Sequence, residues 1–200
     1  ITPTGTLTTL YTFCSKPGCT DGRYPNGGLI QATDGNFYGT TSAGGDQSIA
    51  NCTYQGCGTI FEITPTGAFS TLHTFVSTDG QNPYAGLLQR TDGTFYGTTN
   101  AGGSNGCNRG CGTVFSLSTG LGPFVKLTRD WGKAGQVGGI LGQGFTGTTG
   151  VFLNGTPASF MGISDTHILA TVPTGATSGF ITVTTPSGTL TSNVVFRVTP

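Results

Sequence analysis

The stretch T-D-G-N-F-Y-G-T-T-S-A-G-G at residues 33–45 returns almost unchanged as T-D-G-T-F-Y-G-T-T-N-A-G-G at residues 91–103. A repeat this close restricts which architectures are open to the chain. In each copy, Asp-Gly separates an apolar run from an aromatic pair. Asp-Gly favours the two-residue turn of a β-hairpin, because both central residues of that turn take a positive φ. The stretch therefore predicts a hairpin of residues 28–33 and 36–41, and a second copy of it.

Further blocks extend the repeat on both sides of this hairpin. I-T-P-T-G-T-L-T-T-L-Y-T-F at residues 1–13 matches residues 63–75, and C-G-T-I-F at 57–61 matches C-G-T-V-F at 111–115. In T-P-T-G, which precedes the last strand, proline presets φ and glycine allows a positive one, as a turn requires. One full unit therefore carries four short strands, predicted at residues 28–33, 36–41, 58–63 and 68–75.

The phase of the repeat leaves a strand without its partner at each end. The chain begins with the fourth strand of a unit whose third strand is missing, and near residue 112 it ends with a third strand whose fourth is missing. Residues 5–13 and 112–118 are therefore complements of each other. They could pair within one chain and close the sheet, or between molecules in a head-to-tail array that propagates unless rotation closes a ring. Two units are too few for a propeller, which has about four or more blades.

Composition excludes several classes of protein. The net charge is zero, and only 8% of the 200 residues are charged, while 34% are hydrophobic. Because no basic patch could neutralise phosphates, we expect no nucleic-acid partner. Frequent Thr, Ser, Val and Phe favour strands over helices. No apolar run approaches the roughly 20 residues that span a bilayer, so we expect no membrane insertion.

The cysteines fall into three close pairs, each in a glycine-rich stretch. A zinc site would need four ligands at a tighter spacing, and the two histidines lie far from every pair, so local disulfides are the favoured interpretation over metal. Disulfides are typical of an oxidising, extracytoplasmic compartment, which predicts a secreted or cell-surface protein. The predicted disulfides join Cys14 to Cys19, Cys52 to Cys57, and Cys107 to Cys111.

Beyond Pro123 both the repeat and the cysteines stop. Strand-like runs follow, separated by N-G, P-T-G and P-S-G turns at the roughly 8–12-residue spacing of a β-sandwich. The predicted fold class is therefore all-β. It comprises a repeat-built antiparallel domain of two four-stranded, propeller-blade-like units at residues 1–122 and a β-sandwich at residues 123–200.

The repeat region resembles the GloVer-type tandem repeat of bacterial surface and secreted proteins. The resemblance rests on T-D-G-x-F-Y-G-T-T-x-x-G-G in both copies and on G-T-x-F-x-x-T-P-T-G at residues 58–67, and it covers most of residues 1–118. It implies an extracellular location and no enzymatic role.

The second region resembles an IPT/TIG immunoglobulin-like domain. The motifs that carry this resemblance are V-F-L-N-G-T-P-A at 151–158, I-L-A-T-V-P at 168–173 and I-T-V-T-T-P-S-G at 181–188. Bacterial domains of this kind imply a spacer, stalk or adhesion role. DNA binding, known for some eukaryotic relatives, is not carried over, because the neutral chain lacks the basic loops it would need.

Few residues are candidates for chemistry, and we predict no catalytic residue, no metal site and no cofactor. The carboxylates of Asp34 and Asp92 are explained by their Asp-Gly turns. Neighbouring strand residues point to opposite faces, so one member of each aromatic pair should face the core and the other should face outward. An outward Tyr38 or Tyr96 could stack on a sugar ring, although packing against another sheet or subunit is the favoured interpretation. Asn51 and Asn154 stand in N-x-Thr sequons, with glycosylation the minority interpretation.

The leading functional hypothesis is a structural subunit of an extracellular bacterial fibre or surface layer, with the chain itself as the partner in a homopolymer. Strand addition would join the subunits. The predicted interface residues are Leu7, Leu10, Tyr11 and Phe13 on the donated strand, and Val114, Phe115 and Leu117 on the accepting edge. The alternative is a polysaccharide-binding or adhesion module, or an accessory part of a larger secreted protein. A secreted hydrolase has little support, because its carboxylates would come from turn residues.

Overall fold

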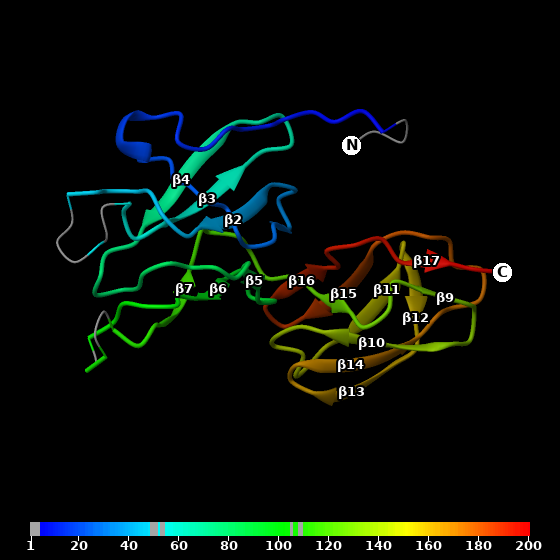
Figure 1. The fold of residues 1–200 in the computed structure, drawn as a ribbon. Helices are drawn as coiled ribbons and strands as arrows, with labels where there is room; N and C mark the ends of the chain where they lie inside the picture. Colours follow the sequence, from blue (N-terminus) through cyan, green and yellow to red (C-terminus); the bar gives the residue numbers. More distant parts are fainter. Residues whose placement is uncertain (1–4, 49–51, 53–54, 105, 108–109) are drawn as a thin grey trace. The chain divides into compact units, whose positions relative to one another are not determined.

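The computed structural model describes residues 5–48, 52, 55–104, 106–107 and 110–200, which form two compact units. Unit 1 comprises Ile1–Gln89 and Phe95–Leu117, and unit 2 comprises Arg90–Thr94 and Ser118–Pro200. The turn of the second repeated hairpin therefore belongs to unit 2, and the division falls at Leu117 where the sequence suggested residue 122. Figure 1 shows both units as assemblies of short strands.

Strands account for nearly all the regular structure of the described chain, which confirms the all-β fold class. The elements of unit 1 are η1 (Pro17–Cys19), β1 (Ile30–Gln31), β2 (Phe37–Thr41), β3 (Thr59–Ile63), β4 (Phe69–Thr74), β5 (Leu88–Gln89), β6 (Phe95–Thr98) and β7 (Val114–Leu117). The elements of unit 2 are β8 (Lys126–Leu127), β9 (Trp131–Gly132), β10 (Val137–Leu141), β11 (Gly150–Leu153), β12 (Thr156–Ala158), β13 (Phe160–Ser164), β14 (His167–Thr171), β15 (Ile181–Thr185), β16 (Gly188–Thr191) and β17 (Arg197–Val198).

The first repeat folds into an antiparallel sheet of order β1-β2-β3-β4, named sheet I here. Its four strands lie where the sequence predicted them. The turn between β1 and β2 contains Gly35 at φ 85°, and the turn between β3 and β4 contains Gly67 at φ 92°. Glycine suits both positions because it adopts a positive φ without steric cost.

The second repeat forms an antiparallel sheet of order β5-β6-β7, named sheet II. Among the residues that the structure describes, it has no strand that corresponds to β4, as the phase of the repeat predicted. At the other end of unit 1, the structure corrects a prediction, because residues 5–13 form no strand. A strand needs a neighbour to satisfy its backbone groups, and among the described residues no third strand of a preceding unit is present beside this segment.

Unit 2 is a β-sandwich with a single hydrophobic core. One sheet has the order β13-β14-β10-β8, and the other has the order β12-β11-β15-β16. Alternating residues of β15 point inward, as its burial pattern shows, and they meet buried side chains of the facing sheet. The core consists of Val125, Ile140, Phe145, Val151, Leu153, Ile168, Val172, Ile181, Val183, Leu190 and Phe196.

Across the described residues, no helix has the length and apolar character needed to cross a membrane.

Candidate functional site

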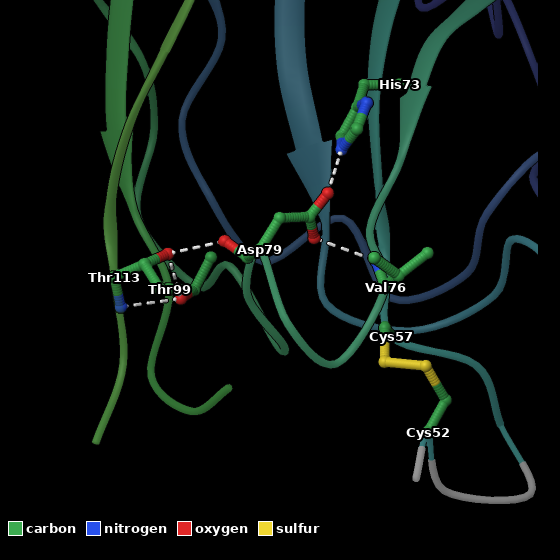
Figure 2. Close-up of polar contacts among 7 residues, drawn as sticks. All are labelled: Cys52, Cys57, His73, Val76, Asp79, Thr99 and Thr113. Carbon is green, nitrogen blue, oxygen red and sulfur yellow. Dashed lines mark hydrogen bonds and ion pairs between the residues drawn. A yellow bond between two sulfur atoms is a disulfide. The ribbon is translucent and has the colours of Figure 1, made fainter. Parts of the chain in front are cut away.

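A polar cluster around Asp79 joins the end of sheet I to sheet II (Figure 2). One carboxylate oxygen of Asp79 accepts a hydrogen bond from the backbone N–H of Val76 at 2.8 Å, and the other lies 2.9 Å from Nε2 of His73. The backbone carbonyl of Asp79 accepts a hydrogen bond from Oγ1 of Thr113 at 2.8 Å. The hydroxyl oxygen of Thr113 in turn lies 2.8 Å from Oγ1 of Thr99. The cluster thus fixes the chain segment that connects one sheet to the next.

The first repeat contains a corresponding cluster. Asp21 accepts hydrogen bonds from the hydroxyl of Tyr11 at 2.7 Å and from the backbone N–H of Ser15 at 2.9 Å. Thr41 and Thr59, which correspond to Thr99 and Thr113, hold their hydroxyls 2.7 Å apart. Tyr11 therefore takes the place of His73, although the two side chains differ in chemistry.

Glycine follows the aspartate in both clusters, because no larger residue fits. Gly22 has φ 92°, and a Cβ atom added to it would lie 2.5 Å from Oγ1 of Thr41. A Cβ atom on Gly80 would lie 2.5 Å from Cγ2 of Thr99. The backbone of each Asp-Gly pair thus packs directly on the threonine pair of the following sheet.

The environment of Asp21 predicts a defined response to acid. Burial acts to raise the pKa of Asp21, but the hydrogen bonds from Tyr11 and Ser15 outweigh it and hold the pKa below its ordinary value. A carboxylate with a lowered pKa contributes stability that is fully present above its unfolded pKa of about 3.9 and is lost as the pH falls through the folded pKa. Asp21→Asn is therefore expected to lower the free energy of unfolding of unit 1 by about 1–2 kcal/mol at pH 7.

Urea unfolding of the parent and of Asp21→Asn at pH 7 and at pH 3 checks this prediction, because the difference between them should shrink at the lower pH. Asp130→Asn in unit 2 is the control and should leave the unfolding of unit 1 unchanged. A difference that stays constant down to pH 3 would contradict the assignment.

The geometry of these clusters suits a structural role. In each, the carboxylate is engaged by a backbone N–H and by a side chain, and the threonine hydroxyls bond to each other. Among the residues that the structure describes, no group of three or more His, Cys, Asp or Glu side chains could hold a metal ion. The hydrogen bonds of each cluster fix the backbone segments that lead into the following sheet.

Aromatic contacts repeat at the same junctions. The rings of Phe75 and Phe115 meet edge to face, with centroids 5.1 Å apart and planes at 65°. The rings of Phe13 and Phe61, at the corresponding positions, lie 4.9 Å apart with planes at 66°. Phe13 thus approaches sheet I as Phe75 approaches sheet II. The residues near Phe13 therefore lie beside sheet I as the residues that follow β4 lie beside sheet II, although residues 5–13 form no strand.

The remaining predicted interface residues divide into engaged and exposed groups. Tyr11 stacks on Phe69 with ring centroids 4.0 Å apart, so its ring is already in contact within unit 1. Leu10 is exposed, and Leu7 is 76% exposed. On β7, Phe115 and Leu117 are half-buried. Among the described residues, β7 pairs with β6 alone, and residues 5–13 form no ladder with it.

Val114 of β7 contrasts sharply with the residue at the same position of the first repeat. Ile60 of β3 is 1% exposed, whereas Val114 is 79% exposed. Sheet I has β4 beside Ile60, and sheet II has no such strand among the residues described. An exposed strand edge of this kind is a template for pairing with another chain.

The two repeated aromatic pairs do not share one pattern of burial. In the first pair Tyr38 is 2% exposed, and in the second it is Phe95 that is fully buried. These two rings pack on each other with centroids 4.4 Å apart. Tyr38 therefore packs against another sheet and is too deeply buried to stack on a sugar, while Tyr96 is half-buried.

Each disulfide joins the two cysteines of one pair, with Cα atoms 4.1 Å apart for Cys14–Cys19, 5.1 Å for Cys52–Cys57 and 5.4 Å for Cys107–Cys111. The Cys14–Cys19 loop lies between Phe13 and Asp21 and contains Ser15, whose backbone N–H belongs to the first polar cluster. Asn154 is exposed, and its side-chain amide donates a hydrogen bond to Oγ1 of Thr177 at 2.8 Å. Asn51, the other sequon residue, lies outside the described residues.

The polar clusters were missed by reasoning from the sequence. Asp21 and Asp79 each stand in an Asp-Gly pair that a turn alone would explain, although the sequence carries a usable signal. Asp-Gly recurs at 21–22 and 79–80, and each copy is followed by a repeated threonine pair. Because the Asp-Gly pair and the threonine pair recur in the same order in both repeats, the sequence indicates that these residues contact each other.

Comparison with known proteins identifies the repeat. The Gloeobacter/Verrucomicrobia repeat family matches residues 1–152, which extends beyond the region that the sequence motifs delimited. This match supports the repeat region and gives no evidence of an IPT/TIG domain in the second region. No curated protein matches the chain.

Two solved structures show remote similarity. The gamma-CGTase from alkalophilic Bacillus clarkii is 19% identical with a TM-score of 0.35, over 82% of this chain and 24% of that one. A fungal alcohol oxidase of the AA5 family, in complex with copper, is 16% identical with a TM-score of 0.29, over 84% of this chain and 40% of that one. The chain thus spans less than half the length of either enzyme, and at these scores neither informs its function.

Proposed function

This chain belongs to the Gloeobacter/Verrucomicrobia repeat family, and from that premise we propose that it is a structural subunit of an extracellular fibre or surface layer. The repeat and the three disulfides indicate a surface or secreted module. Subunits join head to tail, as residues 5–13 of one molecule add to β7 of another and complete its sheet II.

The contrast between Ile60 and Val114 carries this proposal. Equivalent residues of a repeat should have equivalent surroundings, yet Ile60 has a fourth strand beside it and the second repeat over its face, and it is buried. Val114 has no fourth strand beside it among the described residues, and it is exposed. The missing strand has its sequence in the same chain, because residues 1–13 match residues 63–75, which include β4. Main-chain hydrogen bonds along β7 supply affinity in such strand addition, and alternate side chains supply specificity.

The pairing of β3 with β4 predicts the register between molecules. In sheet I, Glu62 lies opposite Ser70, and Ile63 lies opposite Phe69. The corresponding residues are Ser116 opposite Thr8 and Leu117 opposite Leu7. This register places Leu7, which is exposed in the single chain, on an apolar partner.

Residues 5–13 can serve both molecules at once. Within unit 1, β4 pairs with β3 while Phe75, just beyond the end of β4, contacts Phe115 of the next sheet. In the same way, Phe13 contacts Phe61 of its own molecule and leaves Leu7 and Leu10 for the neighbour. Unit 2, an immunoglobulin-like sandwich in this proposal, acts as a spacer along the assembly.

Cysteine cross-linking tests the register. We expect a Thr8→Cys chain mixed with a Ser116→Cys chain to give a disulfide-linked dimer on oxidation, because residues opposite each other in an antiparallel ladder lie about 4.5–5.5 Å apart at Cα. Mass spectrometry of the non-reduced peptides identifies the bond, and electron microscopy of the parent chain should show fibres or sheets.

The matched control is Glu62→Cys in place of Ser116→Cys, since β4 already occupies that position in sheet I. Thr8→Cys should not link to it. A double Thr8→Cys/Ser116→Cys chain that forms the bond only within single molecules would replace the head-to-tail proposal with closure of one sheet.

A further inference from the structure

Sheets I and II pack face to face within unit 1, and their contacts define two faces. We name the face of each sheet that carries Tyr38 or Tyr96 its distal face, and the face that carries Phe37 or Phe95 its proximal face. The distal face of sheet I lies against the second repeat. There Tyr38 packs on Phe95, and Oγ1 of Thr40 donates a hydrogen bond to the carbonyl of Ala85 at 3.0 Å.

The distal face of sheet II is open where that of sheet I is covered. Thr98 is exposed, while the corresponding Thr40 is buried. Leu88 is exposed, while the corresponding Ile30 is half-buried. Tyr96 and Val114 lie on the same face, so the uncovered surface carries apolar side chains among its hydroxyls and is continuous with the open edge of β7.

The proximal face of sheet I shows the reverse contrast. Leu29 is exposed, while the corresponding Leu87 of the second repeat is buried. Phe37 is half-buried, while the corresponding Phe95 is fully buried. Inside unit 1, the distal face of sheet I packs on the proximal face of sheet II. The same two kinds of face remain uncovered in the single molecule, because the distal face of sheet II and the proximal face of sheet I are both more exposed.

We infer that the distal face of sheet II packs on the proximal face of sheet I of the next molecule, with Tyr96 against Phe37 of that molecule as Tyr38 packs on Phe95. This inference rests on the proposed strand addition and extends it from one strand to the whole sheet face. The partner is a second copy of the chain.

The position of the donated strand determines the position of the sheet that follows it. In one chain, β4 continues through Asp79 into sheet II, and the contact of Phe75 with Phe115 fixes the angle of entry. Residues 5–13 continue through Asp21 into sheet I, with nearly the same ring distance and angle between Phe13 and Phe61. A molecule that donates residues 5–13 to a neighbour therefore brings its own sheet I against the neighbour's sheet II.

A charge exchange tests the inferred contact. Phe37→Asp and Tyr96→Arg each place an unpaired charge in the interface, and we expect each to raise the protein concentration needed for assembly by about tenfold or more, the equivalent of 1.4 kcal/mol or more. An equal mixture should assemble near the parent concentration. In the mixture, the aspartate of one variant can meet the arginine of the other, and every native Tyr96 can meet a native Phe37. Sedimentation and electron microscopy measure the assembled fraction.

Assembly of the mixture also shows that each variant is folded. It therefore distinguishes the loss of a contact between molecules from the unfolding of a variant. Met161→Arg, a change at an exposed apolar residue of unit 2, is the matched control and should assemble as the parent does. If both single variants assemble normally while Thr8→Cys still links to Ser116→Cys, the face contact is overturned and strand addition stands. If the cross-link also fails, strand addition itself is overturned.

Discussion

Replacing Phe95 with alanine is expected to lower the free energy of unfolding of unit 1 by about 3–5 kcal/mol, the usual loss for a buried phenylalanine. The ring is fully buried and packs on Tyr38, so its removal leaves a cavity between sheet I and sheet II. Urea unfolding measured by near-ultraviolet circular dichroism, at concentrations below assembly, gives the change. The single tryptophan, Trp131 of β9, reports the unfolding of unit 2 by its fluorescence and so helps assign the transition to a unit.

Phe37→Ala is the matched control, because Phe37 occupies the same position of the first repeat. Its half-buried ring on the proximal face of sheet I should contribute about 1 kcal/mol to the single molecule. Equal losses for the two variants would show that their environments are alike, which would contradict the contrast in burial.

The second large effect is expected from Ser116→Pro, which should abolish assembly while leaving the single molecule folded. The N–H of Thr99 bonds to the carbonyl of Thr113. Because hydrogen-bonded residues alternate along an antiparallel ladder, residues 114 and 116 direct their backbone groups away from β6. Proline at position 116 therefore spares the ladder with β6 and removes a donor that an added strand would need.

Glu62→Pro places the same change at the same repeat position, where β4 already pairs with β3. This control should destabilise the single molecule by about 1–3 kcal/mol, because the lost donor is in use and its acceptor is left unpaired. Analytical ultracentrifugation measures assembly, and circular dichroism measures folding. A Ser116→Pro chain that still forms fibres would exclude β7 as the accepting edge.

The sequence predicts the strands of sheet I and sheet II well, because their signals are local. Asp34-Gly35 fixes the first hairpin, and the period of the repeat carries that assignment to β5 and β6. The segment at residues 5–13 could not be predicted in the same way. Its sequence matches β4, but strand formation depends on a neighbour, and in the described part of the single chain none is beside it.

The burial of side chains at equivalent positions of the two repeats also could not be predicted from the alternation of residues along a strand. Tyr38 and Tyr96 have almost identical flanking residues, yet Tyr38 is buried against another sheet and Tyr96 is only half-buried. The covering sheet is distant in sequence, so alternation along a strand says which residues share a face and leaves open which face is covered. The contact of Asp79 with Thr113 was missed for a similar reason, because each residue has a sufficient local explanation of its own.

The absence of a fourth strand beside β7 in the described chain gives the proposed assembly a direction. One terminus of a fibre always ends in a vacant β7 edge, and the other always ends in a free segment of residues 5–13. The termini then differ in chemistry, so the rates of growth at them need not be equal. A short peptide with the sequence of residues 5–13 would occupy the β7 edge at one fibre terminus and the β7 edges of free subunits alike. The concentration that arrests elongation would therefore rise with the number of free subunits as well as with the number of fibres.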